Sequence, residues 1–271
     1  MKYYDGMVDI DYYAIDTSNY TSNYEVGKVV VEAPIDIFAN NKHIVTLFST
    51  PLMIKELAIG HLLSEGIIKS LDELLDVTVR DTRVHVTTKF DLSLRLRASR
   101  TVKVIDTPCA TVEDFYRLLD RIEKPIVKSD YKVHVKDLMD MIRELNRHST
   151  IFNRCGAVHS AALFYMNELV AFAEDVGRHN AIDKVIGKSA SNGVDFLKCV
   201  LVSTGRQSAS MVLKAARVGI PIIISIRGAI HSGVLAAQKT GVTYITFNRR
   251  KLRVYSYPER LKFESSNLPK K

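Results

Sequence analysis

Arginine side chains follow four predicted strands in the second half of the chain, close to the point where each strand ends. Arg178, Arg206, Arg227 and Arg249 come after apolar segments that end near residues 173, 203, 225 and 247. Three of these arginines lie beside a glycine or at a predicted helix start. Backbone N–H groups at a helix start bind phosphate groups together with arginines. The pattern predicts an anion site, although any one of these arginines taken alone is typical of a solvated loop.

Cys109 is the second candidate for chemistry. It lies two residues before Thr111, a predicted helix N-cap, and it follows a basic run over residues 95–103. The helix dipole and nearby cations both favour the thiolate form of such a cysteine. An accessible thiolate can act as a nucleophile or carry a persulfide. The alternative interpretation is an ordinary loop cysteine.

The other two cysteines indicate no shared site. Cys199 lies inside an apolar strand segment and is predicted to be a buried small side chain. Cys155 lies four residues before His159, a spacing that allows a Cys/His pair. All three cysteines are more than forty residues apart in the sequence. This spacing is typical neither of a disulfide framework nor of a metal site, and it favours a reducing, cytoplasmic compartment.

Motifs of several enzyme classes are missing. A zinc nucleoside deaminase needs His-x-Glu and Pro-Cys-x-x-Cys, and the chain has only the Pro-Cys pair. Neither a phosphate-binding G-x-x-x-x-G-K-[ST] nor a G-x-G-x-x-G sequence occurs. These absences argue against a P-loop ATPase and a Rossmann dehydrogenase.

The positive charge of the chain is concentrated in one place. The net charge is +8, but residues 249–271 hold eight basic and two acidic side chains, which leaves 30 basic and 28 acidic ones in residues 1–248. One local anion-binding element is therefore favoured over a uniformly basic surface. Nucleic-acid binding is a weaker alternative, because the tail lacks the aromatic and glycine pattern of RNA-binding modules. The longest charge-free stretch, residues 155–167, is shorter than the ~20 residues of a membrane span.

The sequence of the N-terminal half predicts an arm followed by an α+β region. We predict an irregular arm or edge strand over residues 1–24, which hold six tyrosines, and an α+β region over residues 25–105. Within it, a hairpin turns at Asn40-Asn41, and a helix over residues 51–65 has Thr50 as N-cap and Pro51 at its first position. Residues 106–130 are predicted to form a cysteine loop and a junction helix at 112–123.

The C-terminal half alternates strands and helices. A helix is predicted at 135–147, a hairpin around 166–168, a helix from Asn180, and strands at 198–203, 220–225 and 242–247. This βαβαβ order is typical of an α/β fold with a parallel or mixed sheet covered by helices. Residues 131–271 are therefore expected to form an α/β ligand-binding domain with a basic C-terminal segment.

Two long motifs resemble those of the formate dehydrogenase accessory sulfurtransferases of the FdhD/NarQ type. The first runs from Glu56 through Gly60, Glu65 and Gly66 to Ile68, and the second covers residues 174–187, including Gly177-Arg178-His179-Asn180 and Gly187. Further similarity extends in order over roughly residues 30–260, with matching residues at Phe152, Gly156, His159, Gly205, Arg206, Met211, Lys214, Phe247, Arg249 and Tyr255.

The resemblance implies a cytidine-deaminase-like three-layer C-terminal domain and a homodimer. It also implies that sulfur is received from a cysteine desulfurase as a persulfide and is passed to a molybdenum bis-pyranopterin guanine dinucleotide cofactor destined for formate dehydrogenase. Cys109 would then be the catalytic residue. The expected cofactor-binding residues are Gly177, Arg178, His179, Asn180, Gly205, Arg206, Phe247, Asn248, Arg249, Arg250, Lys251 and Leu252.

The chain departs from the family pattern in its cysteine loop. The family carries Cys-Gly-x-Cys-Gly, whereas residues 106–110 read Asp-Thr-Pro-Cys-Ala and keep only Cys109. A second hypothesis therefore stays open: a chaperone that binds the cofactor or a guanine nucleotide without persulfide chemistry.

Overall fold

A computed structural model of the chain describes residues 5–93, 95 and 126–263. Cys109, the predicted helix at 112–123 and most of the predicted junction lie outside the described residues.

A six-stranded mixed sheet forms the centre of the molecule, with strand order β13-β12-β11-β10-β8-β9. Strands β10, β11 and β12 are parallel, and β8, β9 and β13 are each antiparallel to their neighbours. The strands are β8 (His159–Tyr165), β9 (Glu168–Asp175), β10 (Cys199–Ser203), β11 (Ile222–Ser225), β12 (Thr243–Asn248) and β13 (Lys251–Val254). The predicted mixed sheet is confirmed.

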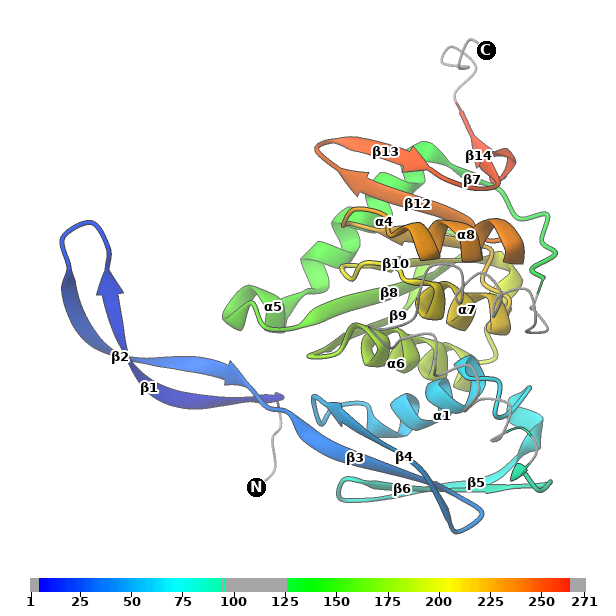
Figure 1. The fold of residues 1–271 in the computed structure, drawn as a ribbon, viewed down its shortest axis with the longest axis horizontal. Coiled ribbons are helices and arrows are strands. Elements are labelled where there is room, and N and C mark those ends of the chain that lie inside the picture. The colour runs from blue at the N-terminus through cyan, green and yellow to red at the C-terminus, as the bar shows by residue number, and fades with distance from the viewer. Residues whose placement is uncertain (1–4, 94, 96–125, 264–271) are drawn as a thin grey trace.

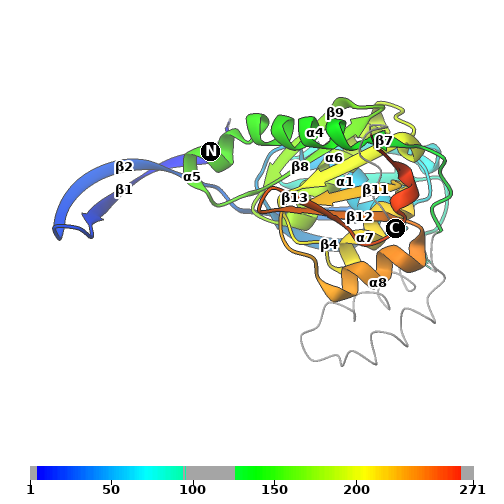
Figure 2. The same cartoon turned by 90° about the horizontal axis from the view of Figure 1, so that it is seen from above.

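Helices cover both faces of this sheet (Figure 2). On one face lies α4 (Val135–His148), which packs on Val200 and Val202 of β10. On the other face lie α6 (Arg178–Ser191), α7 (Ala209–Val218) and α8 (His231–Thr240), which share a core with Leu201. Alternate residues of β10 thus face opposite layers, as expected for a strand buried on both sides. The α/β class is confirmed, and the likeness to cytidine deaminases stays a prediction.

A smaller four-stranded sheet, ordered β4-β3-β6-β5, lies beyond α6 (Figure 1). It consists of β3 (Ala33–Ala39), β4 (Lys42–Ser49), β5 (Leu74–Arg80) and β6 (Arg83–Thr88), and α1 (Ile54–Ser64) packs between it and α6. Ile35 and Val84 of this sheet, Leu57 of α1 and Ile182 of α6 belong to one buried cluster. The N-terminal region therefore shares its core with the C-terminal domain.

Two glycines allow α1 and α6 to cross with their backbones in contact. A Cβ atom on Gly60 would lie 1.7 Å from the carbonyl oxygen of Asp183, and one on Gly187 would lie 1.9 Å from that of Glu56. Real Cβ atoms never approach backbone this closely, so both positions require glycine. The crossing brings the polar side chains of α1 within reach of those on α6 and α7.

The helix predicted over residues 51–65 begins three residues later, at Ile54. The prediction was wrong at its start because Thr50 is buried in a tertiary contact, where its hydroxyl accepts a hydrogen bond from the N–H of Val176 at 3.3 Å. Met53 then adopts the left-handed conformation, with φ of 53°, directly before the helix. At α6 the difference is smaller: the helix begins at Arg178 instead of Asn180.

Of the two alternatives predicted for residues 1–24, an irregular arm or an edge strand, the structure has strands, which form a regular hairpin of β1 (Met7–Asp16) and β2 (Thr21–Val30). Its cross-strand pairs include Tyr13 and Tyr24, whose ring centroids lie 5.4 Å apart. Aromatic and β-branched residues favour strands. The pairing of the two strands was not predicted because polar residues interrupt the period of two. The hairpin projects from the body, and only its root is packed (Figure 1).

Arg260, which had no assigned role, is buried in the structure. Its guanidinium donates hydrogen bonds to the carbonyl oxygens of Gly241 at 2.6 Å and Val127 at 3.4 Å. It therefore fixes the segment around residue 260 to the domain. The remaining elements are short: β7 (Val133–His134), β14 (Leu261–Lys262), α5 (Thr150–Cys155), and the 3-10 turns η1 (Leu71–Glu73), η3 (Phe196–Lys198) and η4 (Pro258–Arg260).

Alanine at either crossing glycine should destabilise the protein. We expect Gly60→Ala or Gly187→Ala to lower the free energy of unfolding by about 3 kcal/mol or more, because the new methyl group meets backbone that cannot move aside. Denaturant unfolding measures the effect. The control is Gly228→Ala, where a Cβ meets nothing within 4 Å, so the change should be within about 0.5 kcal/mol. Equal stability of all three variants would contradict the crossing.

Candidate functional site

The carboxyl ends of four sheet strands lie at one edge, as the sequence predicted. Ser203 of β10 pairs with Ser225 of β11, and Ser225 pairs with Thr246 of β12. Strand β9 runs in the same direction as β10, because both are antiparallel to β8 between them. The segments that carry the four predicted arginines therefore leave the sheet at the same edge, which we call the arginine edge (Arg178, Arg206, Arg227 and Arg249).

Three of these arginines act on the same histidine. Burial lowers the pKa of His159, and the positive charges of Arg178, Arg227 and Arg206 lower it further. A Cβ on Gly205 would lie 2.8 Å from the Cβ of Arg178, so the absence of a side chain at Gly205 lets the two segments touch. Cationic groups from three separate loops thus converge on the start of β8.

A cavity of about 470 Å³ opens beside His159 at this edge. Thr204 and Arg227 from the strand ends line it, together with Gly156 and Phe152, whose side chain is 39% exposed. A cavity of this size admits a small organic ligand. The exposed phenyl ring offers a stacking surface to a base, and the adjacent guanidinium groups offer bonds to phosphates.

The loop that presents Arg178 is held by the buried carboxylate of Asp175. This carboxylate accepts hydrogen bonds from the N–H of Gly177 at 2.8 Å and the amide of Asn180 at 3.1 Å, and pairs with Lys184 at 2.5 Å. Burial lowers the pKa of Lys184, and the charge of Asp175 opposes this effect. The contacts fix the first turn of α6 and hence the position of Arg178.

The N-terminal region completes this arrangement from the other side. The Ser49 hydroxyl donates to Asp175 at 2.5 Å, and the ammonium of Lys184 donates to the carbonyl oxygen of Thr50 at 2.9 Å. Residues more than one hundred positions apart in the sequence therefore satisfy one buried ion pair.

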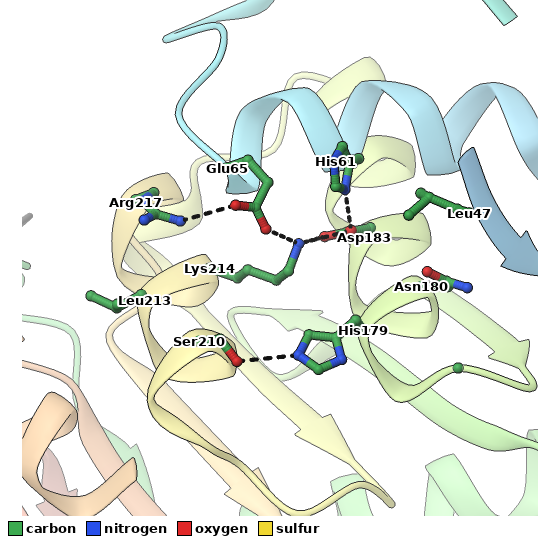
Figure 3. A pocket seen from close by; sticks show the side chains of 11 residues that line it. Leu47, His61, Glu65, His179, Asn180, Asp183, Ser210, Leu213, Lys214 and Arg217 are labelled. Atoms are coloured by element: carbon green, nitrogen blue, oxygen red, sulfur yellow. Dashed lines mark hydrogen bonds and ion pairs between the residues drawn. The ribbon is translucent and has the colours of Figure 1, made fainter. Parts of the chain in front are cut away.

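A second cavity, of about 410 Å³, lies at the N-terminus of α6 (Figure 3). His179 and Asn180 line it, and the His179 imidazole lies 3.2 Å from the Ser210 hydroxyl of α7. Leu47 and Leu213 contribute apolar surface. Of the predicted binding residues at the start of α6, Arg178 thus belongs to the arginine edge, whereas Gly177, His179 and Asn180 line the second cavity.

A buried ionic network forms one wall of the second cavity (Figure 3). The ammonium of Lys214 lies 2.9 Å from Asp183 and 2.8 Å from Glu65, and Arg217 lies 3.8 Å from Glu65. Nδ1 of His61 lies 3.2 Å from Asp183. The charges of two carboxylates, Glu65 and Asp183, are thus balanced by those of Lys214 and Arg217.

Burial alone would raise the pKa of both network carboxylic acids, but their cationic partners reverse the effect. Lys214 and His61 bring the pKa of Glu65 down to about 2 and lower that of Asp183 as well. Burial would lower the pKa of Lys214, and Asp183 and Glu65 raise it. The network therefore stays ionised at neutral pH.

The sequence predicted no role for these network residues, although their spacing along the chain was informative. His61 and Glu65 are four positions apart on α1, and Lys214 and Arg217 are three apart on α7, so each pair shares a helix face. What the sequence did not reveal is that both faces point at Asp183.

The predicted binding segment Phe247 to Leu252 is a tight hairpin between β12 and β13. Asn248 pairs with Lys251, and the two turn residues, Arg249 and Arg250, have positive φ angles of 49° and 62°. Strands β9 and β12 are separated by three others, so this turn lies roughly 19 Å along the edge from the end of β9. Arg249 thus extends the cationic edge without joining the group around His159.

The surroundings of the two described cysteines, Cys155 and Cys199, indicate a role in packing and not in chemistry. Burial, helped by Asp195, raises the pKa of the Cys199 thiol to about 12, which agrees with its predicted role in the core. The thiol of Cys155 donates to the carbonyl oxygen of Ile151 at 3.2 Å, and no contact with His159 supports the pairing that the sequence allowed. Cys109 lies outside the described residues.

The described residues contain neither a candidate metal site nor a helix that could span a membrane. No group of three or more His, Cys, Asp or Glu side chains among them is arranged to hold a metal ion. No helix in the described ranges is long and apolar enough to cross a membrane.

Comparison with known proteins identifies the family. The model of the FdhD/NarQ family matches residues 30–262. The chain belongs to the FdhD/NarQ family. FdhD of Methanothermobacter thermautotrophicus, a sulfur carrier protein, is 33% identical over 237 residues, which are 86% of this chain and 91% of that protein. The sulfur carrier protein FdhD of Bacillus subtilis is 32% identical over 245 residues, or 88% and 93% of the two chains.

A solved structure shares the fold. The crystal structure of a protein from Desulfotalea psychrophila, described as a formate dehydrogenase accessory protein, superimposes with a TM-score of 0.76 at 26% identity. The match covers 94% of this chain and 99% of that one. The mixed α/β fold described above is therefore shared with that structure over most of this chain.

The buried network should make stability depend on pH. The pKa of Glu65 in the folded protein, about 2, is lower than its ordinary value of 4.5. Its contribution to stability is therefore fully present above pH 4.5 and is lost as the pH falls toward 2. Glu65→Gln should lower the free energy of unfolding by about 3 kcal/mol at pH 7. This difference should shrink as pH drops from about 5 to 2.

Urea unfolding at a series of pH values measures this difference. The control is Glu168→Gln at an exposed site, which should change stability by less than about 0.5 kcal/mol. A Glu65 effect that does not vary with pH would contradict the ionised network.

The effect of the arginine charges on His159 should be detectable in the titration of its imidazole ring. We expect Arg206→Gln to raise the His159 pKa, because one of the charges that disfavour the imidazolium is removed. Binding of phosphate at the arginine edge should also raise the His159 pKa, because its negative charge offsets the charges of the arginines. NMR titration of the histidine ring gives the value. Arg143→Gln, an exposed change on α4, is the control and should leave it unchanged; an unaltered pKa in the Arg206 variant would contradict the convergence.

Proposed function

We propose that this FdhD/NarQ protein is a sulfur carrier that supports formate dehydrogenase. In this proposal it accepts sulfur from a cysteine desulfurase and passes it to the molybdenum bis-pyranopterin guanine dinucleotide cofactor, which it binds as a substrate before the cofactor reaches the dehydrogenase. The observation that carries the proposal is the convergence of Arg178, Arg206 and Arg227 beside the cavity at His159.

The chemistry of this edge suits such a cofactor. A bis-dinucleotide carries two diphosphates and two guanines, and guanidinium groups form paired hydrogen bonds with phosphate oxygens. The cavity at His159 is large enough for a base, with Phe152 as a stacking surface. It cannot hold the whole cofactor, so the remainder would extend along the edge toward Arg249 at the end of β12, three strand spacings or roughly 14 Å from His159. A single inorganic phosphate would need no such length.

Cys109 is the proposed sulfur acceptor. Its thiolate attacks the outer sulfur of the desulfurase persulfide; a new S–S bond forms on Cys109, the old S–S bond breaks, and the desulfurase thiolate leaves with the electron pair. No external oxidant or reductant is needed. The basic run before Cys109 would favour the thiolate that attacks.

Intact-mass measurement tests the sulfur step. Incubation with a cysteine desulfurase and cysteine should add the mass of one sulfur atom to the wild-type protein. Cys109→Ser should abolish the adduct, whereas the control Cys155→Ser should keep it. A wild-type protein without any adduct would overturn the persulfide step and favour the chaperone without sulfur chemistry.

Calorimetry with GDP tests the binding step separately. Arg206→Ala should weaken GDP binding at least about tenfold, since each charge-assisted hydrogen bond contributes ~1.5–3 kcal/mol. Cys109→Ala should leave the affinity unchanged. Absence of GDP binding to the wild type would overturn the assignment of the arginine edge.

A further inference from the structure

A serine hydroxyl and a histidine ring meet in the second cavity, on the first turns of two helices (Figure 3). Nε2 of His179 on α6 lies 3.2 Å from Oγ of Ser210 on α7. Both side chains line the cavity and are half-buried, so a ligand in the cavity can reach them. A hydroxyl within hydrogen-bond reach of an imidazole is the arrangement that activates a serine as a nucleophile.

A second serine, Ser208, extends this chain of hydrogen bonds. Its Oγ lies 2.9 Å from Oγ of Ser210. In the His179 tautomer with the ring proton on Nδ1, Nε2 is an acceptor, and the Ser210 hydroxyl donates to it. The single proton of Ser210 is then used, so the Ser208 hydroxyl donates to the Ser210 oxygen. This bond stabilises negative charge on that oxygen as its own proton leaves.

The buried ionic network holds the two helices at this spacing. Asp183 follows His179 by four residues on α6, and Lys214 follows Ser210 by four residues on α7. Each pair therefore shares a helix face. Asp183 and Lys214 are in contact at 2.9 Å. An ion pair one turn further along thus joins the same two faces, so the serine and the histidine need little further ordering before a substrate binds.

The two helix starts provide a favourable place for negative charge. His179 and Ser210 are each the second residue of their helix, and the first N–H groups of a helix have no partner within it. The N-cap residues, Gly177 and Ser208, make no side-chain hydrogen bond to these turns. Helix N-termini stabilise anions, including the oxyanion that forms when a nucleophile adds to a carbonyl group. The cavity therefore suits a reaction at an acyl group.

We propose that Ser210 and His179 are the nucleophile and the general base of an esterase site in the second cavity. The substrate is an uncharged carboxylic ester with a short acyl group. Leu47 and Leu213 offer apolar contact to it, and the charges of the network wall cancel. A cavity of about 410 Å³ holds a molecule of this kind. The inference does not rest on the sulfur chemistry or on the arginine edge.

The reaction has two halves. In the first, Oγ of Ser210 attacks the carbonyl carbon while Nε2 of His179 takes the hydroxyl proton. The bond from that carbon to the alcohol oxygen breaks, the electron pair leaves with the oxygen, and His179 gives the proton to it. In the second, water attacks the acyl group on Ser210, His179 takes a proton from the water, and the released serine oxygen receives that proton. The products are a carboxylic acid and an alcohol, and water is the only co-reactant.

Covalent labelling of the full-length protein tests the nucleophile. A fluorophosphonate reacts with an activated serine, whose oxygen displaces fluoride from phosphorus. Intact mass should show a single adduct on the wild type, and peptide mapping should locate it on Ser210. Ser210→Ala should not be labelled, whereas the control Ser191→Ala, which removes an exposed hydroxyl at the end of α6, should be. A wild type without an adduct, or with the adduct on another residue, would overturn the assignment.

Hydrolysis of p-nitrophenyl butyrate tests the reaction. Ser210→Ala and His179→Gln should each lower kcat/KM at least about a hundredfold, the lower end of what general base catalysis contributes. Ser191→Ala should leave kcat/KM unchanged, and thermal unfolding shows whether each variant stays folded. Absence of turnover by the wild type, or turnover that survives in Ser210→Ala, would overturn the proposal. GDP binding and the sulfur adduct are measured separately, so failure here is distinguishable from failure of the proposed function.

Discussion

The backbone contact between α1 and α6 at Gly60 and Gly187 determines much of what the other residues can do. Without Cβ atoms at the crossing, the helices approach closely enough for α1 side chains to reach a carboxylate on α6. The same packing brings the end of β4 against the loop before α6, where Ser49 meets Asp175. A wider separation of the two helices would leave several ionised groups in the core without partners. The small sheet is thus a structural part of the C-terminal α/β domain.

Buried charge is costly, and the described part of this fold contains the buried ion pairs Asp175–Lys184 and Asp183–Lys214. Each ion pair leaves some oxygens and N–H protons without a partner in the core. Hydrogen bonds from other elements satisfy these groups, and this makes the buried pair stable. Replacement of such pairs by apolar residues is often neutral for stability in proteins. The Asp175–Lys184 pair has a positional role instead, because Asp175 fixes the backbone of the loop that carries Arg178. A preorganised loop binds a charged ligand without a further ordering cost.

The sequence predicted some parts of this structure well and others poorly, for physical reasons. The shared edge of Arg178, Arg206 and Arg227 was predictable because parallel strands end on the same side of a sheet. The partners of Lys214 were not, because Glu65 lies about 150 residues away and only the glycine crossing brings it near. The start of α1 was placed wrongly because local capping preference at Thr50 was overridden by a tertiary hydrogen bond. The pairing of β1 and β2 was not predicted because polar residues interrupt the period of two, and Cys109 lies outside the described residues.

Helix α6 lines the second cavity with its first turn, and it is held near both of its ends. Gly187 is locked against α1, and the first turn is bound to Asp175. A helix clamped in this way can neither rotate nor slide by a useful amount when a ligand enters the cavity. A charge that enters the second cavity can then act on the arginine edge through its electric field, without any change of shape. Thermodynamic linkage between the two places would appear as coupled proton uptake, with the backbone in the same place in every ligand state.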